Sequence, residues 1–181
     1  HSVIEGTSTG VVVVLVDDTG ERTMFPETGA NSGLGIEDLP DLQRFGLIYL
    51  SGYALLDPLS RPGVLEMISR IKKASIPIFF DPATVGGMSE VDIKEVRSWL
   101  PLMSGLFMNE EEATFLTGET DVAKALDSLL IASPLAIVKR GSNGAVAKAR
   151  DGEMLSVPAL STTVVDTTGA GDSFAGGFIA S

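Results

Sequence analysis

Hydrophobic positions along this chain follow two different spacings, and the change falls near residue 47. Residues 9–16 are rich in β-branched side chains, which favour a strand. Residues 17–20 have the composition of a turn, and residues 21–25 return as a second short run, so this part predicts a β-hairpin. Residues 31–35 are expected to form a loop.

Beyond residue 47, short apolar runs alternate with segments of helical spacing. A helix is expected to begin near Pro62, and Asn109 and Thr120 are expected to cap two others. Such an alternation implies a mostly parallel sheet covered on both faces, so the expected fold class is α/β. Strands are predicted at residues 47–50, 76–80, 105–108, 135–139, 145–149 and 153–157, with one more before the glycine-rich turn at residues 169–171. Further helices are predicted at residues 92–100 and 110–116 and after that turn.

Composition narrows the classes of protein that fit. The 181 residues carry a net charge of −11, which disfavours nucleic acids and anionic membranes as partners. There is no cysteine, which excludes disulfides and fits a cytoplasmic protein, and the lone histidine, His1, makes a Ser-His-Asp triad or a histidine-rich zinc site improbable. The longest apolar run, residues 11–16, is too short to span a membrane, and no signal peptide is visible. The ends of the sequence lead us to expect a piece of a longer protein.

The glycine-rich stretch at residues 166–178 is the most informative motif. A glycine-rich turn that opens a helix presents backbone N–H groups and the positive end of the helix dipole, which together bind anions. The turn Gly169-Ala170-Gly171 has this character, and Asp172 beside it would repel an anion unless it has a task such as accepting a proton. Gly176-Gly177 in the same helix predict close packing or close approach of a ligand. The alternative is a plain strand–turn–helix junction.

Polar residues also follow three other predicted strands, at the edge where ligands bind to parallel sheets. Asp81 ends one strand and Asn109 another, with Glu112 on the same helix face as Asn109. Their oxygens suit Mg²⁺, although an ordinary helix cap explains the same pattern. Residues 139–144 follow the third strand and offer charge and glycine flexibility for phosphate groups, or else a simple turn.

Taken together, these strand-end motifs resemble those of the ribokinase-like (PfkB) carbohydrate kinases. The resemblance implies a ribokinase-like three-layer sandwich, with residues 1–35 as a lid-associated hairpin segment and residues 36–181 as a partial nucleotide-binding core. Asp81-Pro82 resembles a family motif in which Asn usually stands where this chain has Ala83. Asp81 is therefore a candidate on the substrate side or a structural residue.

The resemblance further implies transfer of the γ-phosphate of ATP to a sugar hydroxyl. Asp172 would act as general base, and the N–H groups of Gly169, Ala170 and Gly171 would stabilise the transferred phosphoryl group. The resemblance also implies ATP contacts from Lys139, Gly141, Gly144 and Thr168, Mg²⁺ held with Asn109, Glu112 and Asp166, and a monovalent cation such as K⁺ near Asp166 and Thr168.

Other functions stay open at this stage. Nucleoside and other small-molecule kinases share the glycine-rich turn, and a catalytically silent domain that binds nucleotide or sugar would keep it too. A nicotinamide-binding domain fits poorly, because Phe174 stands where the third glycine is needed. The expected partner is a small sugar, and pairing of the lid strands would give a homodimer.

Overall fold

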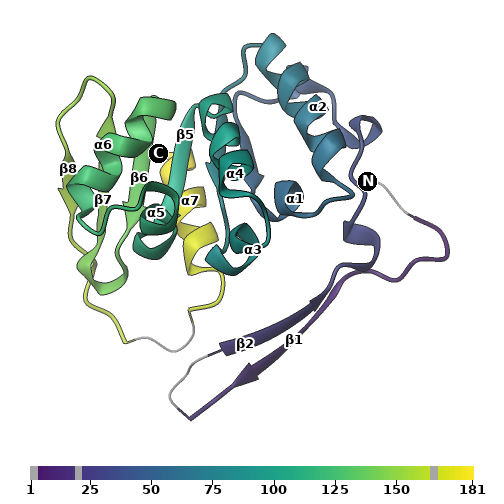
Figure 1. Ribbon diagram of the computed structural model, residues 1–181, viewed down its shortest axis with the longest axis horizontal. Helices are drawn as coiled ribbons and strands as arrows, with labels where there is room; N and C mark the ends of the chain where they lie inside the picture. The colour runs from purple at the N-terminus through teal and green to yellow at the C-terminus, as the bar shows by residue number, and fades with distance from the viewer. Residues whose placement is uncertain (1–3, 19–21, 164–166) are drawn as a thin grey trace.

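The computed structural model describes residues 4–18, 22–163 and 167–181, and it contains two separate sheets (Figure 1). Strands β1 (Val11–Val16) and β2 (Arg22–Glu27) form the predicted antiparallel hairpin. The second sheet has six strands in sequence order, β3 to β8. The first three pairings of this sheet are parallel and the last two are antiparallel, which confirms the mostly parallel α/β fold. The six strands are β3 (Ile48–Ser51), β4 (Ile78–Asp81), β5 (Gly105–Asn109), β6 (Leu135–Lys139), β7 (Ala145–Ala149) and β8 (Leu155–Val157).

The helices match the predicted segments with two additions and one correction. The additions are α1 and α3, which are too short to give a periodic signal. The correction concerns α6: its cap is Asp121, whose carboxylate accepts a hydrogen bond from the Lys124 N–H at 3.0 Å, and not Thr120. The helices are α1 (Tyr53–Leu56), α2 (Arg61–Lys73), α3 (Val85–Ser89), α4 (Ile93–Trp99), α5 (Glu110–Thr117), α6 (Val122–Ala132) and α7 (Ala170–Ala180).

The two faces of the large sheet are covered unequally. One face packs on helices α2 to α6 around the fully buried Phe80, Trp99 and Leu106. The other face carries Phe107 and Ile137, and Ala175 of α7 packs against them. The layers are therefore helices, sheet and α7, as expected for the three-layer sandwich (Figure 1).

Helix α7 is less tightly packed than the sequence led us to expect. Ala175 is its one buried residue, and a Cβ atom added at Gly176 or Gly177 would meet nothing within 4 Å. The expectation that these glycines serve close packing is therefore wrong for the described residues. Gly177 instead lines a cavity beside the sheet, so approach of a ligand remains as the explanation for it.

The β1–β2 hairpin projects away from the rest of the molecule (Figure 1). Every side chain of β1 is between 44% and 62% exposed, although all are valine or leucine. Because side chains alternate along a strand, Val13 and Phe25 lie on one face of the hairpin and Val14 and Met24 on the other. Both faces are thus apolar and uncovered among the described residues. The division into domains at residue 35 stays a prediction.

Candidate active site

The polar strand ends meet at one edge of the sheet, as predicted. Strands β4, β5 and β6 end at Asp81, Asn109 and Lys139. Asp81 and Lys139 follow Phe79 and Ile137 by two residues, so they share the sheet face on which those side chains pack beside α7. Their charged groups therefore lie at the edge from which α7 begins.

Lys139 joins this edge of the sheet to the glycine-rich turn. Its Nζ atom lies 2.6 Å from Oδ2 of Asp81, and the two side chains are 18% and 8% exposed. The same Nζ atom lies 3.2 Å from the position that a Cβ atom on Gly171 would occupy. A glycine at position 171 thus leaves room for the ammonium group, which is bracketed by a carboxylate and by the start of α7.

Tyr49 of β3 belongs to the same cluster and was missed by the sequence reasoning. Burial raises the pKa of its hydroxyl well above its usual range, and the negative charges of Asp81 and Asp172 and a side-chain hydrogen bond with Asp81 act in the same direction. Its ring also packs against Phe107, with centroids 6.3 Å apart. A tyrosine within an apolar strand looks like a core residue, so the sequence carries no signal for this contact.

Asn109 and Glu112 form a reciprocal capping box at the start of α5. Oδ1 of Asn109 accepts from the Glu112 N–H at 2.7 Å, and Oε2 of Glu112 accepts from the Asn109 N–H at 2.8 Å. Glu112 is only 3% exposed. Burial raises the pKa of its carboxyl group despite this hydrogen bond. The helix-cap alternative is therefore correct as a description of their contacts, and their predicted role at Mg²⁺ stays a prediction.

The glycine-rich turn begins α7 in the geometry that its sequence predicts. Gly169 adopts a left-handed conformation with φ of 70°, which favours glycine. The Ala170 N–H already donates to the carbonyl of Thr167 at 3.2 Å, so an anion at the turn would share that donor. Asp172 is exposed in the first turn of the helix. Asp166, predicted to bind a cation, lies outside the described residues.

The turn after β6 also needs its glycines. Gly141 has φ of 55° and Gly144 has φ of 84°. A Cβ atom at Gly144 would stand 2.0 Å from the carbonyl oxygen of Val157, so the turn is pressed against the end of β8. Arg140, the other cation here, pairs with Glu110 at 2.8 Å. Both cations are paired with a carboxylate, but Lys139 is the better placed of the two for a ligand at the glycine-rich turn, because its Nζ atom lies beside Gly171.

A mostly apolar cavity of about 650 Å³ lies between α7 and strands β6 to β8. It reaches from the turn after β6 to the aromatic side chains of α7 and to the segment that follows β8. Its lining includes Gly141, Gly144, Val157, Leu160, Phe174 and Phe178. The two glycines expected near the phosphate groups, Gly141 and Gly144, therefore line the same cavity as the apolar side chains.

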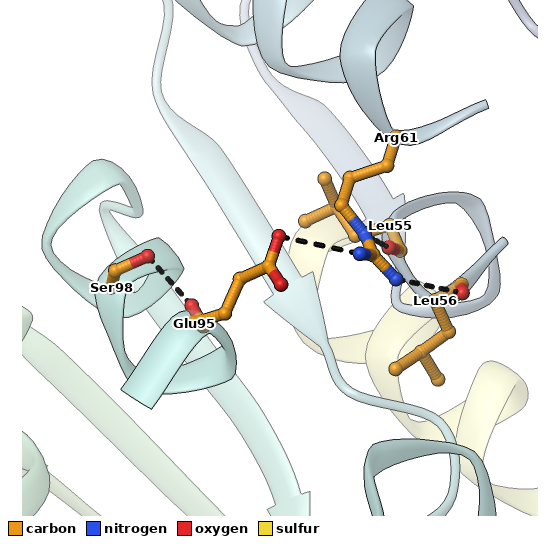
Figure 2. A network of polar contacts seen from close by, with 5 residues as sticks. All are labelled: Leu55, Leu56, Arg61, Glu95 and Ser98. Carbon is orange, nitrogen blue, oxygen red and sulfur yellow. Dashed lines mark hydrogen bonds and ion pairs between the residues drawn. The ribbon is translucent and has the colours of Figure 1, made fainter. Parts of the chain in front are cut away.

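Arg61 supports the strand end that carries Asp81. Figure 2 shows its guanidinium group donating to the carbonyls of Leu55 and Leu56, at 2.7 and 3.1 Å, and meeting Glu95 at 3.3 Å. These carbonyls end α1, which begins after Gly52, and the Gly52 N–H donates to the carbonyl of Asp81 at 2.6 Å. Arg61 therefore fixes α1, and α1 in turn contacts the strand that ends in Asp81.

Comparisons with known proteins agree with this architecture. Residues 1–181 match the model of the family described as pfkB family carbohydrate kinase. The chain is 31% identical to a fructokinase from Klebsiella pneumoniae over 180 residues, covering 95% of this chain and 58% of that protein. It is 30% identical to a ribokinase from Schizosaccharomyces pombe, covering 97% of this chain and 55% of that protein.

Solved structures give the same assignment. Adenosine kinase from Sinorhizobium meliloti superposes with a TM-score of 0.85 at 27% identity, over 94% of this chain and 53% of that one. Fructokinase from Vibrio cholerae O395, solved with fructose, ADP and calcium, gives 0.75 at 25% identity, over 93% of this chain and 57% of that one. The chain belongs to the PfkB family of carbohydrate kinases and spans little more than half the length of these relatives. Within the described ranges, no helix is long and apolar enough to cross a membrane.

Proposed function

We propose that the whole protein transfers the γ-phosphate of ATP to a hydroxyl group of a sugar. The observation that carries this proposal is the convergence of Lys139, Asp81 and the turn at residues 169–171 at one edge of the sheet. Membership of the PfkB family supports the same reaction. This edge combines a cation, backbone N–H groups and a carboxylate, which are among the parts that phosphoryl transfer needs.

In the proposed mechanism, Asp172 accepts the proton of the attacking hydroxyl group. Its exposure in the first turn of α7 supports this role, because an acceptor hydroxyl can reach it from solvent. The N–H groups of Gly169, Ala170 and Gly171 would face the oxygens of the transferred group and would stabilise the charge that develops there. The Lys139 ammonium group adds a positive charge beside Gly171.

Asn109 and Glu112 would orient the water shell of a Mg²⁺ ion. Each uses one oxygen in the capping box, so contact through water fits them better than direct ligation. Mg²⁺ would add to the neutralisation of phosphate charge in a chain whose net charge is −11. A monovalent cation held by backbone near Asp166 and Thr168 stays a proposal from the family resemblance.

The apolar cavity beside α7 would take the base of the nucleotide. It starts at Gly141 and Gly144, the glycines expected near the phosphates, and continues past Phe174 and Phe178. Aromatic side chains provide stacking surface for a flat base. Thr168 completes the proposed contacts to ATP.

The reaction is tested by ADP release from the whole protein, supplied with MgATP and a panel of pentoses, hexoses, sugar acids and nucleosides. Release that depends on one compound identifies the acceptor. Asp172→Asn is expected to lower turnover by about 10²–10⁴-fold while nucleotide binding persists. Near-normal turnover of that variant contradicts the role of Asp172.

Two other functions are separated by the same assay. A nucleoside kinase is supported by the similarity to adenosine kinase from Sinorhizobium meliloti, and ADP release with nucleosides alone would favour it. A silent sensor would bind MgATP without turnover on any compound. The retained Asp172 argues against the sensor, because a carboxylate weakens binding of an anion.

We further propose that the whole protein is cytoplasmic and forms a homodimer through the β1–β2 hairpin. A two-stranded hairpin is marginal in water by itself. Here both of its faces are apolar, so one face can cover the acceptor while the other contacts a second copy.

A further inference from the structure

The ion pair between Lys139 and Asp81 is unusual in its position. Asp81 ends β4 and Lys139 ends β6, and β5 lies between them in the sheet. Neighbouring strands are about 4.8 Å apart, so the ion pair bridges roughly 10 Å of sheet edge, and both side chains contribute to that reach. It does so across the end of β5, at Asn109. The ammonium group is therefore held over the centre of the candidate site.

Asp81 is itself fixed from several directions. Its Oδ1 atom accepts from the Ala83 N–H at 3.0 Å, and its carbonyl accepts from Gly52 at 2.6 Å. Ala83 has a φ of 73°, a left-handed conformation that is strained for a residue with a side chain. The carboxylate that holds Lys139 is thus oriented by the turn at Ala83, and the backbone of Asp81 is held by Gly52, the residue that precedes α1.

The ion pair lies among other acidic side chains, so it also affects the charge that an incoming phosphate group would meet. Asp81, Asp172 and Glu112 all act on Tyr49 as negative charges. The Nζ atom of Lys139 contacts Asp81 and lies 3.2 Å from the position that a Cβ atom on Gly171 would occupy. A phosphate group arriving at that turn would meet an ammonium group that already has a carboxylate partner.

We propose that Asp81 is a positioning residue: it holds the Lys139 ammonium group at the turn of residues 169–171 as a built-in counter-ion, and it shares that group with the incoming phosphate. This role differs from the substrate-side role expected for Asp81. The ion pair keeps Lys139 from reaching elsewhere before the anion arrives. Its consequence for turnover rests on the proposed kinase function, but its consequence for anion binding does not.

The binding test uses inorganic tripolyphosphate and isothermal titration calorimetry on the whole protein, in EDTA. Lys139→Met should weaken binding about tenfold or more, because a charge-assisted contact is lost. Asp81→Asn should tighten binding about threefold to tenfold, because the competing carboxylate is gone. In the double variant, the tightening should vanish, since no ammonium group remains to be released.

A matched control exists on the surface of the same domain. Lys148 and Asp127 also form an ion pair, distant from the candidate site, between β7 and α6. Lys148→Met and Asp127→Asn should leave tripolyphosphate binding unchanged. Equal effects from the control pair would mean that net charge alone governs binding, and this result would overturn the proposal.

The turnover test separates positioning from a structural role. With the acceptor found by ADP release, Asp81→Asn should lower kcat about tenfold or more while the KM for that acceptor stays the same. Asp81→Glu should restore part of the loss. A raised acceptor KM with normal kcat would place Asp81 on the substrate instead, and weaker tripolyphosphate binding by a folded Asp81→Asn variant would also refute the inference. A wild-type protein without turnover refutes the kinase function, while the calorimetry still decides the role of Asp81.

Discussion

Ser75→Gly is expected to stabilise the protein, and the structure gives the reason directly. Ser75 follows the end of α2 with φ of 59°, in the left-handed region. Its N–H donates to the Lys72 carbonyl at 2.9 Å, and the Ile76 N–H donates to the Ile71 carbonyl at 3.3 Å. This is the Schellman arrangement that usually places glycine at this position. The serine side chain is exposed, so its removal costs little packing.

The magnitude follows from two opposing terms. The left-handed conformation costs a residue with a side chain about 1–2 kcal/mol. Glycine loses roughly 0.5–1 kcal/mol more backbone entropy on folding than other residues. The net gain is about 0.5–1 kcal/mol, which raises the midpoint of thermal unfolding of a domain of this size by about 1–4 °C.

Chemical denaturation and calorimetry of the whole protein would measure this gain. Ala74→Gly is the matched control, because Ala74 stands one residue earlier at φ of −80°, where glycine brings only its entropic cost. The control should lose about 0.5–1 kcal/mol. If both variants lose stability to the same extent, the conformational argument fails.

Three further predictions follow from the same contacts. Ala83→Gly should raise stability by relieving its φ of 73° yet lower kcat, because the turn that orients Asp81 loosens; a thermal melt and the ADP assay check both, and unchanged stability would contradict the strain. Burial opposes ionisation of Asp57, but hydrogen bonds donated by Ser60, Ser32 and the Gly33 N–H lower its pKa overall. The folded-state pKa therefore lies below the unfolded value, so Asp57 stabilises the fold above the unfolded pKa and loses this contribution as pH falls. Asp57→Asn should be less stable than wild type near pH 7 with a gap that narrows in acid, and a constant gap in urea titrations would argue against it. Replacing Val14 by Lys should convert the proposed hairpin dimer into a monomer in size-exclusion chromatography, whereas a monomeric wild type would contradict that dimer.

The sequence predicts most of this fold because its strands and helices have clean periodicity. Val64, Ile68 and Ile71 are buried at helical spacing, as expected for α2. The short helices α1 and α3 have too few residues for a periodic pattern, and they form because tertiary contacts such as those from Arg61 to Leu55 hold them. The sequence could not choose between Thr120 and Asp121 as the cap of α6, because both side chains can accept a hydrogen bond from an N–H group of the first turn.

The candidate site was predictable in its location but not in its pairings. Residues at the carboxyl ends of parallel strands meet at one edge whatever their identity, so Asp81, Asn109 and Lys139 were expected together. Which charges pair depends on side-chain reach across strands, and sequence spacing carries no measure of that reach. Of the two explanations for Gly176-Gly177, close packing is wrong among the described residues and approach of a ligand stays a prediction, since the helix propensity of glycine does not reveal what faces it.

The placement of Lys139 links the fold to the proposed chemistry. A chain with a net charge of −11 must assemble positive potential locally if it is to bind a polyphosphate. The parallel sheet provides this by ending β6 in a lysine and beginning α7 with exposed N–H groups at the same edge. Without a fixed partner, an ammonium group near Asp81, Glu112 and Asp172 could pair with any of these carboxylates. Its 2.6 Å contact with Asp81, whose carboxylate is anchored by the turn at Ala83, selects one orientation, directed at Gly171. The fixed carboxylate of Asp81 therefore competes with the arriving phosphate for the ammonium group, and in the proposal it also keeps that group in the orientation that phosphoryl transfer requires.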